Sequence, residues 1–201
     1  MTIILLIRHG DTEYTGEKLA GRIDSPLNVE GKEQSERIAV ALKHLPIKAI
    51  VASPMIRTQQ TALPLARLLN LDIEICEGLN QVNFGDWQGL SFEELDQNPE
   101  WQTFQENPAT AKIPGGEDGN MVRERVSKAV LALAKQYSDD SIIACYSHGS
   151  IIRHTISHFI GLPLDNLNQI RVATASISTL RLIDNQGTLL HLNQEISVNW
   201  L

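Results

Sequence analysis

Four residues of two kinds could together bind and attack a phosphate group: Arg8, His9, Arg57 and His148. Arginine presents a planar set of N–H donors that matches phosphate oxygens, and it stays charged at any working pH. A neutral histidine carries a nitrogen lone pair that can attack phosphorus. The fixed cations and the second imidazole could then stabilise the charge on the phosphoryl group during its transfer. These residue types favour phosphoryl-transfer chemistry, provided that the fold brings them together.

Each of these residues follows a segment that is typical of a buried strand. Short apolar runs at residues 2–7, 47–53 and 141–147 suit central strands that are covered on both faces. The two histidines come just after the first and third runs, and Arg57 lies in the helix expected after the second. Ligands of open α/β sheets gather beyond the carboxyl ends of the strands, so we expect these residues to meet at one edge of the sheet.

The rest of the chain alternates between helical and strand patterns. Helices are expected at about 28–45, 54–69, 117–137 and 149–160, and further strands at 71–79, 175–183 and 187–193. Pro64 should kink or divide the second helix. Strands that alternate with helices predict an α/β fold, a three-layer α/β/α sandwich with a mostly parallel central sheet. A chain of 201 residues suits one domain, 1–201, and is too short for two.

Residues 84–116 differ in composition from the rest of the chain, with aromatic side chains and several prolines on short polar segments. We expect this stretch to be a small helical cap insertion over one end of the sheet. Trp87 and Trp101 are expected to pack inside the cap rather than to stack on nucleic-acid bases. The tail 193–201 (NQEISVNWL) could fold back over the mouth of the site.

Composition argues against several functional classes. The formal net charge of -7 argues against a general nucleic-acid surface, but it is compatible with a local cationic pocket for a small anion. No apolar run approaches the roughly 20 residues that span a bilayer, and the first residues lack the pattern of a secretory signal. We therefore expect a cytoplasmic protein with no membrane and no nucleic-acid partner. Cys76 and Cys145 are expected to be buried free thiols.

Five motifs, in this order, resemble the histidine phosphatase (phosphoglycerate mutase-like) superfamily: LIRHGDTE, SPMIRTQQTA, LNQVNFGDWQG, PGGED and YSHGSIIRH. The resemblance covers about residues 2–180, nearly the whole chain. It implies that His9 is the nucleophile that becomes phosphorylated, and that Arg8, Arg57 and His148 complete the phosphate pocket. It also implies a reaction through a phosphohistidine, with no metal and no cofactor, and a variable cap that selects the rest of the substrate.

One position departs from the pattern of the family. The family normally carries a glutamate where this chain has Gln81, and that glutamate gives a proton to the leaving oxygen. A neutral amide has no proton to give near neutral pH, and losing general acid catalysis typically costs about 10²–10⁴ in rate. The chain could be a slower phosphatase for good leaving groups, or use another acid, or bind phosphate esters and scarcely turn them over. The nearest other acids in sequence are Asp11, Glu77 and Asp86. An engineered substitution of the glutamate by glutamine would also explain Gln81.

Three further residues are expected to bind substrate. The backbone N–H groups that open the helix at Gly149 could add partial positive charge to the pocket. Thr15 stands where many relatives have an asparagine that touches phosphate, and its hydroxyl could still donate one hydrogen bond. Gln81 lies in a motif that the resemblance assigns to the pocket.

The expected activity is that of a phosphatase acting on a small phosphorylated metabolite, such as phosphoserine, a phosphoglycerate or α-ribazole phosphate. Mutase-type phosphoryl transfer is the alternative, although mutases of the family tend to be longer than this chain. A phosphate-ester sensor without turnover is the non-enzyme alternative. The sequence does not determine the oligomeric state, and a homodimer through an edge strand or the cap is compatible with it.

A metal site is the main competing interpretation of the histidines. His154 and His158 are spaced as two ligands on one helical face, but Thr155 stands where a glutamate would follow the first ligand. Packed or exposed histidines are the expected outcome. A nucleotide-binding loop is not indicated, since GGEDG lacks the following Lys-Ser/Thr and no strand precedes it.

Overall fold

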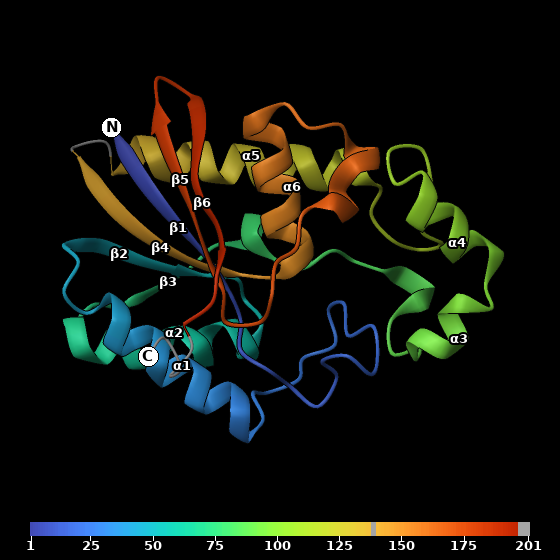
Figure 1. The fold of residues 1–201 in the computed structure, drawn as a ribbon, viewed down its shortest axis with the longest axis horizontal. Coiled ribbons are helices and arrows are strands. Elements are labelled where there is room, and N and C mark those ends of the chain that lie inside the picture. The colour runs from blue at the N-terminus through green and yellow to red at the C-terminus, as the bar shows by residue number, and fades with distance from the viewer. Residues whose placement is uncertain (138–139, 197–201) are drawn as a thin grey trace.

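The computed structural model describes residues 1–137 and 140–196, and Figure 1 labels its elements. The described strands form one sheet of six in the order β3-β2-β4-β1-β5-β6. They are β1 (Thr2–Arg8), β2 (Ile47–Ala52), β3 (Ile73–Ile75), β4 (Ser141–Ser147), β5 (Ile177–Ile183) and β6 (Gln186–Gln194). The first four run parallel to one another, whereas β5 and β6 are antiparallel to their neighbours. The expected mostly parallel sheet is therefore confirmed. Residues 197–201 of the tail expected to cover the site lie outside the described residues.

Helices cover both faces of this sheet (Figure 1). They are α1 (Val29–Leu42), α2 (Ile56–Leu69), α3 (Phe92–Asp96), α4 (Pro99–Glu106), α5 (Gly119–Gln136) and α6 (Gly149–Ile160). Short 3₁₀ helices span Glu77–Leu79, Gly85–Trp87 and Leu164–Gln169. α1 and α2 lie on one face and α5 and α6 on the other, which confirms the three-layer arrangement.

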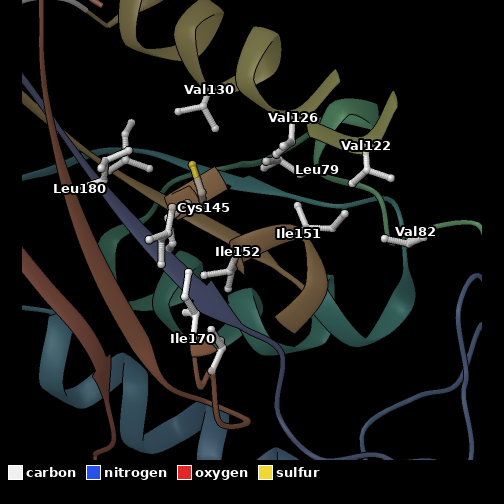
Figure 2. Close-up of a cluster of buried hydrophobic side chains, with 14 of the residues drawn as sticks. Leu79, Val82, Val122, Val126, Val130, Cys145, Ile151, Ile152, Ile170 and Leu180 are labelled. Atoms are coloured by element: carbon white, nitrogen blue, oxygen red, sulfur yellow. The ribbon is translucent and has the colours of Figure 1, made fainter. Parts of the chain in front are cut away.

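The apolar runs form strands because both of their faces are buried. In β1, Leu5 and Ile7 pack toward α1 and α2, while Ile4 and Leu6 pack toward α5 and α6. Successive side chains of a strand point to opposite faces, so a strand between two helical layers needs apolar residues at every position. Figure 2 shows the second of these cores, where valines of α5 and isoleucines of α6 surround Cys145 of β4. This packing fixes the point at which each strand ends.

One sequence prediction about the elements is wrong, and of the two outcomes expected at Pro64, a kink or a division, the division does not occur. The strand expected at 71–79 is only three residues long, because β3 is an edge strand paired with β2 alone and its outer side chain Ile75 is half exposed. α2 runs unbroken through Pro64. Proline at this position removes one helical hydrogen bond, and the buried face that includes Ala62 and Leu65 keeps the helix on the sheet.

Residues 84–116 contain α3 and α4 and lie beyond one end of the sheet (Figure 1). Their aromatic rings pack on one another: the centroids of Trp87 and Trp101 are 5.4 Å apart, and Phe104 contacts both. Both tryptophans are buried, with exposed fractions of 2% and 5%. The rings therefore hold this segment together, and they offer no open stacking platform.

Within the described residues no helix is long and apolar enough to cross a bilayer. Both cysteines are free thiols; Cys145 is buried, and Cys76 is partly exposed.

Candidate active site

The sheet places the two predicted histidines side by side. β1 and β4 pair in parallel with Arg8 opposite Ser147, so His9 and His148 leave neighbouring strands at the same level. The backbone N–H of His9 donates to the carbonyl of Ser147 over 3.0 Å. The ring centroids of the two histidines are 5.2 Å apart, with an angle of 62° between the rings.

Of the two predicted arginines, Arg57 is buried and Arg8 is partly buried, and backbone carbonyl groups hold both. Arg57, in the first turn of α2, donates to the carbonyls of Gly21 and Ile23 over 2.7 and 2.9 Å. Arg8 donates to the carbonyl of Val172 over 2.7 Å. In the described part of the chain neither forms an ion pair, and the buried Nε atom of each has no hydrogen-bond partner. Burial lowers the pKa of each guanidinium to about 10, so both remain charged at neutral pH.

His9 is held with its nucleophilic nitrogen free. Its Nδ1 lies 2.7 Å from the carbonyl oxygen of Gly10, which can only accept, so Nδ1 carries the proton. Nε2 then carries the lone pair. Burial, reinforced by the charges of Arg8 and Arg57, holds the pKa of His9 well below its usual value. The imidazole is therefore neutral and nucleophilic near pH 7.

Ser53 holds the other histidine. The Nε2 atom of His148 lies 2.8 Å from the Ser53 hydroxyl, which can donate to this nitrogen or accept from it, and which also accepts from the backbone N–H of Met55. Of the two ring nitrogens, only Nδ1 is then left for another partner. That Nδ1 is buried without a partner among the described residues. Burial, followed by the charge of Arg57, keeps the pKa of His148 well below its usual value. A neutral imidazole therefore lies against His9.

A pocket of ≈ 320 Å³ contains most of the predicted site residues. Six of them line it: Arg8, His9, Thr15, Arg57, Gln81 and Gly149. His148 is fully buried behind His9 and does not reach the pocket surface. The other wall comes from the segment 84–116, through the aromatic side chains of Phe84, Phe92, Trp101 and Phe104. The pocket is thus cationic and imidazole-lined on the sheet side, and largely apolar on the other.

Gln81 and Thr15 can donate hydrogen bonds into this pocket. The Oε1 atom of Gln81 accepts from the backbone N–H of Val82 over 2.9 Å, which leaves its amide N–H groups to donate. The Thr15 hydroxyl accepts from the backbone N–H of Thr12 over 3.0 Å, and its proton can point elsewhere. Neither side chain can transfer a proton at neutral pH.

The two glycines that follow the histidines have different roles. A Cβ atom on Gly149 would lie 3.4 Å from Nε of Arg8, an ordinary contact distance, so the guanidinium lies beside the start of α6. A Cβ atom on Gly10 would come within 2.6 Å of the carbonyl oxygen of Gly31 in α1. Gly10 therefore serves the close packing of α1 on the loop after β1.

The structure does not place the candidate replacement acids in the pocket. Asp11, Glu77 and Asp86 are absent from its lining. The Asp11 carboxylate accepts from the side chain of Gln34 over 2.7 Å, and the other two are exposed.

Among the described residues, Glu117 is the one carboxylate that lines the pocket. It accepts hydrogen bonds from Arg22, Arg125 and the backbone N–H of Asn83. Burial raises its pKa, but the hydrogen bonds and charges of these partners outweigh burial and leave the pKa below the usual value. Glu117 is therefore ionised at neutral pH and has no proton to give.

Several pocket residues are not predicted from the sequence, notably Tyr14, Lys18, Arg153 and His154. The sequence could have indicated the last two. Arg153 and His154 follow Gly149 and Ser150 by one helical turn, so they lie on the same face of α6.

The histidines at 154 and 158 do not form part of a metal cluster in the described part of the chain, where no group of three or more potential ligands gathers. The Nδ1 of His154 donates to the carbonyl of Ser150 over 2.8 Å, and His158 is exposed and packs on Phe159.

The chain is similar to known proteins in sequence and in fold. Residues 4–195 match the model of the histidine phosphatase superfamily (branch 1). The chain is 31% identical over 183 residues to the probable phosphoglycerate mutase GpmB of Enterobacter sp. (strain 638), an alignment that covers 90% of this chain and 85% of that protein.

Solved structures show the same fold. Phosphoserine phosphatase of Entamoeba histolytica, in complex with 3-phosphoglyceric acid, is 26% identical with a TM-score of 0.87, and the match covers 96% of this chain and 98% of that one. YhfR of Bacillus stearothermophilus is 23% identical with a TM-score of 0.91, over 98% of this chain and 100% of that one. A mycobacterial glucosyl-3-phosphoglycerate phosphatase is 24% identical with a TM-score of 0.86, over 96% and 98% of the two chains.

Proposed function

The chain belongs to the histidine phosphatase superfamily, and we propose that it is a metal-independent phosphomonoesterase that works through a phosphohistidine at His9. The observation that carries this proposal is the tautomer of His9. Its Nδ1–H donates to the carbonyl of Gly10, so Nε2 carries the lone pair, and the side chain lines a pocket together with Arg8 and Arg57. The two guanidinium groups supply positive charge where the transferring phosphoryl group is negative.

The reaction has two displacement steps. Nε2 of His9 attacks phosphorus, the bond from phosphorus to the leaving oxygen breaks, and its electron pair leaves with that oxygen. The ring now carries positive charge, which the hydrogen bond from Nδ1–H to the Gly10 carbonyl stabilises. Water then attacks phosphorus, the P–N bond breaks, and phosphate leaves while the proton of the water passes to solvent.

Gln81 limits the first step. Its amide can donate a hydrogen bond to the leaving oxygen but cannot protonate it. Substrates whose leaving group needs no proton should therefore react well, and alkyl phosphates slowly.

The substrate class of this proposal is a small phosphorylated metabolite that carries a carboxylate or a sugar. Support comes from the names of similar proteins, a phosphoserine phosphatase and a glucosyl-3-phosphoglycerate phosphatase. We assign the segment 84–116 the role of a cap that selects the leaving group, because its aromatic side chains form the wall opposite the phosphate-binding residues.

Mutase activity is the second candidate, because the curated relative at 31% identity bears the name probable phosphoglycerate mutase. A mutase would pass the phosphoryl group from His9 back to a hydroxyl of a bound acid instead of to water. The two functions share the first step and differ only in the acceptor.

The test is phosphate release from p-nitrophenyl phosphate at pH 5 to 8, with and without EDTA, together with chemical trapping of the enzyme. We expect release that EDTA leaves unchanged and an acid-labile, alkali-stable phosphoryl label on His9. Conversion of 3-phosphoglycerate to 2-phosphoglycerate faster than phosphate release would favour the mutase. If neither release nor label is found at any pH, the chain is a phosphate-ester-binding protein and the proposal is wrong.

The pH profile provides an independent check. Because the pKa of His9 is depressed, the imidazole stays neutral as pH falls through 6.5. Protonation of His9 should therefore cause no loss of rate in this range. With phosphoserine as substrate, the second ionisation of the ester, about pH 6, should be the only step in kcat/KM in this range. The ³¹P shift of the free ester gives that ionisation separately. An additional enzyme ionisation between pH 6 and 7 would contradict the neutral buried imidazole.

A further inference from the structure

One face of α6 lines the pocket from the phosphate-binding end outward. Gly149 and Ser150 lie in its first turn, and Arg153 and His154 lie one turn later on the same face. A rise of 1.5 Å per residue places Arg153 about 6 Å further along the helix than Gly149. Since Gly149 lies beside the guanidinium of Arg8, the later pair lies beyond the residues proposed to bind phosphate, on the side of the leaving group.

Arg153 is a cation that the described protein does not neutralise. Its buried Nε atom has no hydrogen-bond partner, and it forms no ion pair with the described residues. It is close enough to Arg8 that its charge contributes to the lowered pKa of that guanidinium. By contrast Arg125, on the neighbouring helix α5, pairs with Glu117 over 2.8 Å. A partly buried, unpaired charge is costly unless something else neutralises it.

The positive charge around the pocket exceeds the negative charge of one phosphate group. The cationic side chains that line it are Arg8, Lys18, Arg57 and Arg153. The lining carboxylate, Glu117, already pairs with two arginines outside this set, Arg22 and Arg125. A phosphate dianion at His9 balances two of the four charges. Lys18 is exposed to solvent, so Arg153 is the partly buried charge that a ligand has to match.

His154 adds a neutral acceptor next to Arg153. Its Nδ1–H donates to the carbonyl of Ser150, so Nε2 carries the lone pair, and this buried atom has no partner among the described residues. Burial lowers the pKa of His154 to about 4, so the ring stays neutral. The side chain of His154 lines the pocket, so Nε2 is an unused hydrogen-bond acceptor beside Arg153. A neutral ring of this kind suits a hydroxyl of the ligand and not an anion.

From these observations we infer that Arg153 and His154 form a second subsite that recognises the leaving group of the substrate. Arg153 binds an anionic group, a carboxylate or a second phosphate, about one helical turn from the phosphorus, and His154 accepts from a neighbouring hydroxyl. The inference rests on the proposed function for the position of the phosphorus at His9. It narrows the substrate to phosphomonoesters whose leaving group is itself anionic.

Matched pairs of aryl phosphates test the subsite. The first pair is 3-carboxyphenyl phosphate and 3-carbamoylphenyl phosphate, which have similar size but differ in charge. The second pair, 1,3-phenylene bisphosphate and 3-hydroxyphenyl phosphate, tests a second phosphate in place of the carboxylate. Affinities are measured by titration calorimetry in a His9→Ala background, so that the esters are not consumed. Each is measured again with Arg153→Gln and with Arg153→Lys added.

We expect the anionic member of at least one pair to bind about tenfold or more tightly than its neutral partner, as for a charge-assisted hydrogen bond. Arg153→Gln should abolish that preference and change the affinity of the neutral partner less than about threefold, whereas Arg153→Lys should retain part of it. The matched control is Arg67→Gln, because Arg67 is exposed on α2 and does not line the pocket. The pair that shows the preference identifies the anion.

Two results would overturn the inference: equal affinity within both pairs, or a preference that survives Arg153→Gln. Because the assay measures binding alone, it gives an answer whether or not the protein turns over phosphate esters. A failure of the proposed function would appear instead as absent release and absent label in the turnover assay.

Discussion

His9→Ala is expected to lower kcat/KM for p-nitrophenyl phosphate by a factor on the order of 10⁴ or more, as removal of a nucleophile does in covalent catalysis. Nε2 of His9 carries a free lone pair on a neutral ring. Among the described residues, His9 is the one histidine that lines the pocket beside both Arg8 and Arg57. His148 cannot replace it, because its Nε2 is engaged by Ser53 and its ring is buried behind His9.

The matched control is His44→Ala, because His44 is an exposed histidine in the loop after α1 and lies outside the pocket. This variant should retain the activity of the unaltered protein. The phosphoryl label should disappear from His9→Ala alone, and thermal unfolding should show that this variant is folded. A label that persists in His9→Ala, or more than about a hundredth of the activity, would place the nucleophile elsewhere.

The convergence of the two histidines was predictable from sequence because it depends on strand ends. Fully apolar runs fix β1 and β4 between helical layers, and the polar residues that follow must then emerge at the same edge. That β1 and β4 are direct neighbours, with His9 against His148, was not predictable, because strand order depends on crossover packing that a single sequence does not reveal.

The sequence was least informative about what surrounds the residues that we propose to bind phosphate. Glu117 gives no local sign that two arginines from separate segments hold it ionised. Asp11, Glu77 and Asp86 were candidates because they are near the motifs in sequence, and the structure places all three outside the pocket lining. Closeness along the chain is a poor guide where loops turn sharply. The helical spacing of Arg153 and His154 after Gly149 would have indicated the pocket lining better.

Gln81→Glu is expected to accelerate hydrolysis of alkyl phosphates such as phosphoserine by about 10²–10⁴, the usual contribution of a general acid. The same change should alter hydrolysis of p-nitrophenyl phosphate only a few-fold, because its leaving group hardly needs a proton. Gln81 lines the pocket, and none of the described carboxyl groups there has a proton to give at neutral pH. The measurement is the ratio of the two kcat/KM values, which cancels general changes in folding or binding.

The new activity should also depend on pH in a way that identifies its source. A glutamate at this position acts as an acid only while protonated, so the gain on phosphoserine should fall as pH rises through the pKa of the new carboxyl. The control is Gln88→Glu, the same chemical change at a residue that contacts the backbone of Arg22 and does not line the pocket. Equal acceleration of both substrates, or of both variants, would show that the proton comes from elsewhere. The selective gain would instead locate the leaving oxygen beside residue 81, and it would show that the missing proton, and not a weakened phosphate pocket, limits the natural chain.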